Sequence, residues 1–343
     1  MIGTRFSRFL PRCNCIYLAL VLLMVTTSQS SLLAQDSLKH KKDKKLVHLI
    51  DTLLIDKDLN NWSVRAVTSY KDNRFNLSNS NNTLQYTPNN RTGIGVGIAT
   101  SKIIADIVLN IKSSNEEQTE RFDFQGNVQI KQNIISLQVQ NYQGYNVRNT
   151  TTGEPEIFRK DIRTFTTSLS FMHMFNANTK TLSSIYSGLN MDNKSSGTFL
   201  AGIYVGYYLI QADSSIIPES SKDLFNQEAH IEQLNQFSFG VAGGYGYYLA
   251  LPKNFFILVA LTPGLGMGFQ NIQAESLSYS PQELWEIYLY GNLSLGYNGS
   301  RIYVELSDKN KWNYVPLGNG NYGLTNATNL KLAFGWNIKG KKK

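Results

Sequence analysis

The chain has 343 residues, of which 33 are Lys or Arg and 25 are Asp or Glu, so its formal charge is +8. Charged residues make up only 17% of the chain, against roughly 25% in an ordinary soluble domain. Together with a hydrophobic share of 42%, this composition argues against a disordered chain, against long helices and against a dense basic patch for nucleic acid. Nucleic acid is therefore not an expected partner.

Residues 1–34 have the features of a secretory signal peptide. Three arginines precede ten apolar residues, 16–25, a run too short to cross a bilayer as a helix. Cleavage is expected after Ala34, the alternative being an uncleaved anchor. Both cysteines precede this position, so the mature chain would have no disulfides and no Cys-based catalytic or metal sites.

The basic residues of the remaining chain are concentrated at its two ends. Residues 35–60 would form a basic N-terminal periplasmic arm, 61–339 the main domain, and 340–343 a basic tail. Such an arm can meet anionic lipid headgroups, or it is simply a solvated linker.

A period of two in hydrophobicity, the pattern of a β-strand, recurs along the main domain. In residues 121–131, for example, Phe122, Phe124 and Val128 share one face, while Arg121 and Asp123 lie on the other. The clearest strands are expected at 121–131, 135–140, 198–209, 237–249, 257–269, 285–297 and 330–338. Weaker ones are expected at 62–75, 84–100, 102–112, 161–175, 181–191 and 300–314.

Many of these strands are 10–15 residues long, whereas soluble strands usually have about 5–6 residues and a membrane-crossing strand needs about 9–11. Aromatic residues at strand ends also match the girdles of outer-membrane barrels. The sequence therefore predicts an all-β fold, a closed antiparallel transmembrane β-barrel of about 12 strands (range 10–14), in an outer membrane.

Short links alternate with long connections, as the turns and loops of such barrels do. The long connections are expected at 112–120, 144–160, 212–236 and 271–284, with a short helix over the barrel mouth within 213–236. The barrel would contact outer-membrane lipids, and barrel-assembly machinery during its biogenesis.

Four short segments carry a family resemblance: 86–89 (YTPN), 93–97 (GIGVG), 142–145 (YQGY) and 194–200 (KSSGTFL). In this order and spacing the chain, over about residues 48–339, resembles the domain-of-unknown-function family four-four-two-one. These are predicted outer-membrane β-barrels of Gram-negative bacteria. The resemblance implies a barrel at the outer membrane and brings no known activity, substrate or catalytic residue.

Charged residues on the polar faces of the strands are the candidate site, because a Lys or Arg facing lipid at the midplane would cost about 2–4 kcal/mol. We expect them to point into the lumen, where they either fill it or line a conducting pore. They are Arg65, Arg121, Asp123, Lys131, Arg163, Glu286, Arg301 and Glu305.

No catalytic, cofactor-binding or metal-binding residues are assigned, and no cofactor is expected. His173 shares a face with Phe165 and Phe171, whereas Ser168 and Ser170 point to the opposite face, which argues against a Ser–His pair. His230, between Glu228 and Glu232 on a polar segment, is expected to be solvated rather than to hold a metal.

The expected function is therefore non-enzymatic, structural or as a narrow passage with a largely filled polar lumen. The alternatives are an outer-membrane lipid hydrolase, and a secreted or periplasmic β-protein that binds a polymer. No ligand is identified.

Overall fold

The computed structural model describes residues 62–100, 103–111, 117–175 and 194–338. These residues all belong to one compact unit, Leu53–Lys343. The predicted signal peptide, basic arm and basic tail lie outside them, as does the strand predicted at 181–191. No helix within the described ranges has both the length and the apolar character needed to cross a membrane.

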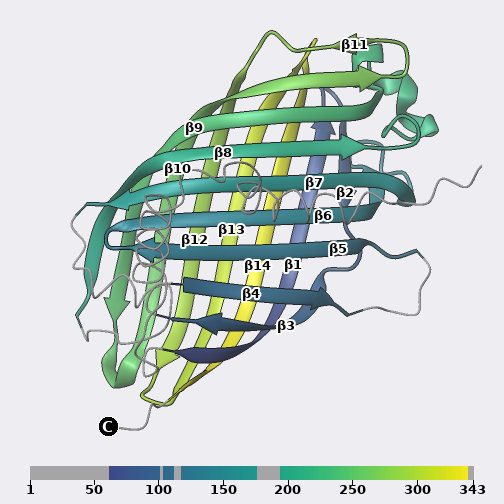
Figure 1. Ribbon diagram of the computed structural model, residues 1–343. Coiled ribbons are helices and arrows are strands. Elements are labelled where there is room, and N and C mark those ends of the chain that lie inside the picture. The colour runs from purple at the N-terminus through teal and green to yellow at the C-terminus, as the bar shows by residue number, and fades with distance from the viewer. Residues whose placement is uncertain (1–61, 101–102, 112–116, 176–193, 339–343) are drawn as a thin grey trace, which may run out of the picture. The chain divides into compact units, whose positions relative to one another are not determined.

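The described residues are mostly β-strand (Figure 1). The strands are β1 (Ser63–Ser78), β2 (Thr83–Thr87), β3 (Thr92–Ala99), β4 (Ile103–Asn110), β5 (Glu120–Ile130), β6 (Asn133–Asn149), β7 (Ile157–Met174), β8 (Ser196–Gln211), β9 (Ile231–Ala250), β10 (Phe255–Ala274), β11 (Ser278–Tyr279), β12 (Trp285–Asn298), β13 (Ile302–Gly318) and β14 (Asn321–Asn337). Three short 3₁₀ helices accompany them: η2 (Glu219–Leu224), η3 (Gln227–Ala229) and η4 (Pro252–Asn254).

In this part of the chain, fourteen strands form one antiparallel sheet, and all except β2 and β11 make a closed ring of twelve. The ring closes where β1 pairs with β14 along its whole length, from Ser63 opposite Asn337 to Ser78 opposite Tyr322. Purple β1 therefore lies beside yellow β14 (Figure 1). Closure leaves the ring without a free edge, and it confirms the predicted all-β closed barrel of about 12 strands.

Several predicted elements have different bounds; β14, for example, begins at Asn321 rather than at 330. Two of the differences have a local cause. The single strand expected at 84–100 is divided into β2 and β3 by Pro88, which has no N–H to donate to a ladder. Residues 144–149 were expected to be loop but extend β6, because Gly144 adopts a positive φ of 89° at a bulge. Beyond this bulge β6 pairs with β2, which bridges β1 and β6 above the shorter strands β3, β4 and β5.

One end of the barrel carries mostly short connections and the other mostly long ones. We call the first the turn end; it has two-residue or three-residue links after β3, β5 and β12. We call the other the loop end; it carries the connections 150–156, 212–230 and 275–284. The connection between β7 and β8 is a long exception at the turn end, and most of it lies outside the described residues.

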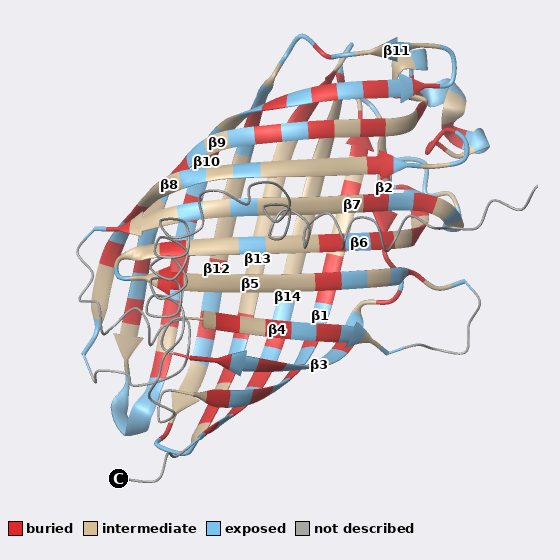
Figure 2. Ribbon diagram, in the orientation of Figure 1, coloured by how far each residue is buried: buried red, intermediate tan, exposed pale blue. Residues whose placement is uncertain are grey.

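Side chains alternate between the lumen and the outer face along each strand. In β1, Arg65 and Val67 are 1% and 2% exposed, whereas Val64 and Tyr70 are 51% and 41% exposed. The alternation is visible as bands of buried and exposed residues along the strands (Figure 2). The outer face is the apolar one, which is the facing that the sequence pattern predicts for a membrane barrel.

Candidate functional site

The lumen is the candidate site, and its turn end is crossed by an apolar layer. We call this layer the apolar floor. It is built from buried side chains of strands all round the ring: Val67, Val108, Ile134, Met174, Leu200, Tyr248, Phe256, Leu258, Tyr303 and Ala333.

Charged residues lie next to the floor. Asp106 of β4 accepts a hydrogen bond from Lys331 Nζ at 2.8 Å, and Arg65 Nε lies 3.5 Å from its other oxygen. Glu305, on β13, accepts a hydrogen bond from the neighbouring Tyr303 hydroxyl. Each of these carboxylates is at least nine-tenths buried, so pairing with cations and hydroxyls offsets the cost of removing its charge from water.

A second charged group surrounds Asp123 on β5. Lys71 Nζ lies 3.0 Å from the Asp123 carboxylate, which also accepts hydrogen bonds from Gln140 and Tyr142 at 2.9 Å. The Arg121 guanidinium, 1% exposed, lies 3.9 Å from the same carboxylate and also bonds to Asn110. This carboxylate therefore draws β1, β5 and β6 together inside the barrel.

Toward the loop end from these groups lies a cavity of about 160 Å³, the lower chamber. Its wall combines amide and hydroxyl side chains such as Gln125 and Ser136 with the lysines Lys71, Lys309 and Lys311. Lys71 has Asp123 as its partner, but Lys309 and Lys311 have no carboxylate within 4 Å among the described residues. Six cationic side chains and four carboxylates lie along the chambers and beside the floor, so together these groups have a positive formal charge. The cations are Arg65, Lys71, Arg121, Lys309, Lys311 and Lys331, and the carboxylates are Asp106, Asp123, Glu286 and Glu305.

A tyrosine pair narrows the lumen above the lower chamber. Tyr204 and Tyr288 stack with ring centroids 5.0 Å apart, and Lys311 Nζ lies 5.4 Å from the Tyr288 centroid. Tyr204 has room because Gly240 and Gly266 face it; a Cβ at either position would collide with its ring or hydroxyl. Large side chains on one wall thus interdigitate with glycines on another.

Glu286, 1% exposed, anchors this constriction through neutral donors. The Tyr204 hydroxyl donates to Oε1 at 2.9 Å, while Ser238 Oγ and Gln236 Nε2 donate to Oε2 at 2.9 and 3.0 Å. These three hydrogen bonds offset the cost of burying the carboxylate away from water.

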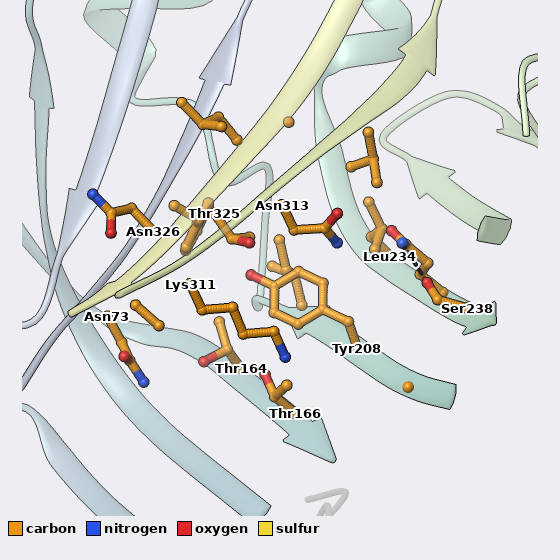
Figure 3. A pocket seen from close by; sticks show the side chains of 18 of the residues that line it. Asn73, Thr164, Thr166, Tyr208, Leu234, Ser238, Lys311, Asn313, Thr325 and Asn326 are labelled. Carbon is orange, nitrogen blue, oxygen red and sulfur yellow. Dashed lines mark hydrogen bonds between the residues drawn. The ribbon is translucent and has the colours of Figure 1, made fainter. Parts of the chain in front are cut away.

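A second cavity of about 130 Å³, the upper chamber, lies between the tyrosine pair and the loop end. Figure 3 shows Tyr208, Thr164 and Lys311 projecting into it, with Asn313 and Thr325 on the wall behind. The two chambers share Asn73, Tyr204, Tyr288 and Lys311 as lining residues.

Residues 212–230, here called the mouth loop, cover the upper chamber. Ile216, Ile217, Phe225 and Ala229 of this loop are 0–7% exposed and pack in one apolar cluster with wall residues such as Tyr86. The Tyr86 hydroxyl donates to the Ile216 carbonyl at 3.1 Å. The helices η2 and η3 belong to this loop and lie beside β11 (Figure 1). This arrangement agrees with the short helix predicted over the barrel mouth.

Polar contacts attach the mouth loop to connections and strand ends at the loop end. Asn79 Nδ2 donates to the Leu224 carbonyl at 2.9 Å, and Arg159 Nη1 donates to the Ser215 carbonyl at 3.0 Å. Asn226 Nδ2 donates to the Asn319 carbonyl at 3.0 Å. The Tyr279 hydroxyl donates to the Glu228 carbonyl, also at 3.0 Å. The loop is therefore attached on several sides of the mouth.

An ion-paired latch adds to these contacts. Lys222 Nζ lies 2.9 Å from both Glu219 and Glu275, and His230 Nδ1 lies 3.4 Å from Glu275. The hydrogen bond from Lys222 lowers the pKa of Glu275, and hydrogen bonds to Glu219 and Glu275 raise the pKa of Lys222. The latch is therefore charged on both sides near neutral pH.

Five of the eight charges predicted for the lumen lie there: Arg65, Arg121, Asp123, Glu286 and Glu305. The other three do not. Lys131 and Arg301 are exposed residues of the turns after β5 and β12, beyond the wall. Arg163 is exposed on the outer face of β7, because side chains alternate along the strand and it lies two residues from the outward-facing Phe165, whereas Thr164 faces inward.

His173 faces outward, as the sequence indicated, whereas His230, expected to be solvated, has a side chain that is only 15% exposed and lies against Glu275. His173 lies on the outer face with its ring against Phe175 and its Nδ1 2.9 Å from Asn133 Oδ1. Ser168 and Ser170 line the lower chamber on the opposite face of β7. No group of three His, Cys, Asp or Glu side chains in the described ranges could hold a metal ion.

Sequence reasoning missed five charged lumen residues: Lys71, Asp106, Lys309, Lys311 and Lys331. Lys331 alternates with Leu330 and Leu332, so parity alone could have identified it. The lysines of β13 lie in a stretch where polar residues occupy both faces, so alternation gave no signal there.

Several solved structures are similar to this chain. The beta domain of the Bordetella autotransporter BrkA is 7% identical with a TM-score of 0.38, covering 80% of this chain and 99% of that one. The translocator domain of the autotransporter NalP from Neisseria meningitidis is 12% identical with a TM-score of 0.34, covering 88% and 96%. OmpT, an outer membrane protein of Vibrio cholerae, is 6% identical with a TM-score of 0.28, covering 81% and 99%.

No curated protein matches the chain in sequence. A family model does match, over residues 49–337, and its description is "Domain of unknown function (DUF4421)". This match includes every strand of the ring, so the chain belongs to the DUF4421 family.

Proposed function

We propose that this protein is a non-enzymatic outer-membrane β-barrel whose lumen is closed at rest. The observation that carries the proposal is the apolar outer face, because every strand of the ring exposes at least one large hydrophobic side chain. Examples are Val64, Ile94, Leu109, Phe122, Leu137, Leu169, Phe199, Val241, Leu265, Ile287, Leu306 and Phe334. A soluble protein rarely exposes an apolar surface that encircles it, whereas a membrane barrel requires one.

The polarity of the two ends supports an orientation in this membrane. Outer-membrane barrels have short turns on the periplasmic side and longer loops outside. The turn end would then face the periplasm and the mouth loop the exterior, with outer-membrane lipids around the belt. Assembly would depend on the barrel-assembly machinery.

The inner arrangement favours a structural role or a gated narrow passage over an open porin. Barrels of about 8 strands are filled by side chains, and those of 16 or more enclose an aqueous channel. Here a ring of twelve holds two small chambers between an apolar floor and an apolar mouth loop. Solute could pass only if the mouth loop and the floor moved.

The alternative of a lipid hydrolase has little support from the geometry. His173 faces outward while Ser168 and Ser170 face the lower chamber, so the nucleophile and base of a hydrolase do not meet at this position.

Fractionation tests membrane residence and planar bilayers test closure. The protein should require detergent for extraction from the outer-membrane fraction and should migrate differently before and after heating in gel electrophoresis. Reconstituted wild-type protein should give little or no steady conductance. Recovery in the soluble periplasm would favour the polymer-binding β-protein instead, and porin-like conductance would contradict the closed lumen.

A further inference from the structure

Two arginines on the outer face of the barrel converge on one buried carboxylate. Phe75 and Leu77 of β1 pack inside the lumen, so the alternating residues Asp72 and Arg74 project outward. Arg74 forms an ion pair with Asp72, and Arg91 Nε, from the connection between β2 and β3, lies 3.7 Å from the other carboxylate oxygen. Asp72 is 5% exposed, whereas the two arginine side chains remain 35% and 32% exposed.

Arg91 is held in place by further contacts. Its Nη1 donates to the Tyr70 hydroxyl at 2.8 Å and its Nε donates to the Pro88 carbonyl at 2.9 Å. Its guanidinium carbon lies 5.9 Å from the centroid of the Tyr70 ring. An arginine fixed in this way loses little side-chain entropy when it binds an anion.

The arginine pair lies at the border of the apolar belt. On its turn-end side the outward residues are Val64, Ile94 and Val96, which are 51%, 60% and 67% exposed. On its loop-end side the outward residues of β1 are Asn76 and Ser78. In the proposed orientation, this border is the level of the lipid headgroups in the outer leaflet.

The charges at this border do not balance. Two guanidinium groups share one carboxylate, which leaves one positive charge, and the buried Arg74 Nε has no hydrogen-bond partner. Guanidinium groups bind phosphate through paired N–H donors. A head that offers phosphate oxygens, attached to chains that cover Ile94 and Val96, would complement both halves of this surface.

We propose that Arg74 and Arg91 bind the phosphate group of an outer-leaflet lipid whose acyl chains lie on the strip formed by Ile94 and Val96. This inference rests on the proposed membrane residence. The continuity of the charged pair with the apolar strip favours an amphiphile over a free anion, which would gain nothing from the strip.

Native mass spectrometry of the detergent-purified protein tests the site. The wild-type protein, Arg74→Gln/Arg91→Gln and the control Arg163→Gln are titrated with phosphatidylglycerol, lipid A and an uncharged diacylglycerol. Arg163 is the matched control because it is exposed on the outer face of β7. We expect the double variant to bind the phosphate lipids at least about tenfold more weakly than the wild type. A tenfold loss corresponds to about 1.4 kcal/mol, which is within what hydrogen bonds to charged groups contribute. Arg163→Gln should bind like the wild type, and diacylglycerol should bind weakly to all three.

Phosphatidylglycerol offers a phosphate diester and lipid A offers phosphate monoesters. The lipid whose binding falls more in the double variant identifies the source of the phosphate. Three outcomes would overturn the proposal. They are equal lipid binding by the wild type and the double variant, equal losses of binding in the double variant and in Arg163→Gln, and a lipid-free dimer that depends on Arg74 and Arg91. If the double variant does not fold, each single Gln variant should show part of the loss. A protein that shifts on heating but shows no arginine dependence contradicts this site alone, whereas a detergent-independent soluble protein contradicts the proposed function.

Discussion

At the scale of single residues, facing in the wall decides what a side chain does. Leu137 and Gln138 are neighbours on β6, yet Leu137 is 37% exposed on the outer face and Gln138 lines the lower chamber. A polar residue in the lumen finds hydrogen-bond partners, whereas the same residue outside would meet lipid.

Exchanging each of these two residues for arginine tests the facing. We expect Leu137→Arg to reduce the free energy of unfolding by about 2–4 kcal/mol, because the charge would lie against hydrocarbon. Gln138→Arg should be much milder. Urea titration of the heat-modifiable band in lipid vesicles measures both. Equal effects, or a larger effect at Gln138, would mean that the facing is wrong.

Asp308 is an exception on the outer face. Its neighbours across the strands are Leu293 and Leu330, which are 46% and 42% exposed, and one carboxylate oxygen accepts a hydrogen bond from Asn310 at 3.0 Å. A carboxylate at this depth costs free energy, although less than Lys or Arg does.

We therefore expect Asp308→Leu to stabilise the barrel by up to about 2 kcal/mol in lipid. The same urea titration measures this gain, with Asp223→Leu in the exposed mouth loop as the control. A loss of stability would show that Asp308 has a polar partner in the assembled membrane.

The alternation of apolar and polar residues predicted the direction of a side chain wherever one face of a strand was uniformly apolar. The prediction was wrong where a residue was assigned to the lumen by its charge alone. Arg163 shares the parity of Phe165 and faces outward, against the expectation that every wall arginine points inward. Lys131 and Arg301 would face inward if the alternation of their strands continued. They lie just outside the strands, however, where the alternation no longer determines the direction of a side chain.

At the scale of elements, the strand pattern predicts most of the wall, but the mouth loop depends on tertiary packing. Residues 212–230 have no alternation, and their large apolar residues fall in two adjacent pairs, 216–217 and 224–225. Ile216 and Phe225 are buried because wall residues from distant strands surround them. Only a short helix over the mouth was predictable, whereas the cluster that it completes was not.

The apolar members of the mouth loop should hold it closed. Replacing Ile216 and Ile217 with Asn would bury two amides in an apolar cluster, at about 1–3 kcal/mol each. We expect this variant to show frequent openings in planar bilayers while remaining heat-modifiable. Leu224→Asn, a partly exposed position of the same loop, is the control and should stay closed. Silence of the double Asn variant would mean that the floor alone blocks the lumen.

The latch between Lys222 and Glu275 should make closure depend on pH. Because the pKa of Glu275 is lowered from its ordinary 4.5, its contribution is present above pH 4.5 and is lost as the pH falls through the lowered value. The pKa of Lys222 is raised from 10.5, so its contribution is present below pH 10.5 and is lost at higher pH.

We therefore expect openings to become more frequent as the pH falls below 4.5 and through the lowered pKa of Glu275. The frequency at neutral pH should be higher in Glu275→Gln than in the wild type. The variant should also respond less to acid, because one titrating partner is gone. His230 and Glu219 remain in both proteins, so a full acid response in Glu275→Gln would assign the effect to them or to other groups.

At the scale of the whole molecule, the length and number of alternating strands predict a closed barrel, and the structure has a ring of twelve. The division of the lumen into a floor, two chambers and a mouth loop was not predictable, because each layer combines residues from many strands. Lys309 of β13, for example, lines the same chamber as Gln125 of β5 and Ala242 of β9.

The excess of cations in the lumen should give an opened barrel a preference for anions. Lys309 and Lys311 have no carboxylate within 4 Å among the described residues, so their charge is available to a passing ion. On the background of the Ile216→Asn/Ile217→Asn variant, the reversal potential in a potassium chloride gradient should indicate chloride preference. Adding Lys309→Gln and Lys311→Gln leaves four cations against four carboxylates in this region, so the preference should disappear. Lys253→Gln, in the exposed turn between β9 and β10, is the control and should leave it unchanged. Cation preference with both lysines present would show that the carboxylates Asp106, Asp123, Glu286 and Glu305 dominate the path, and that ions pass on the side of the lumen away from β13.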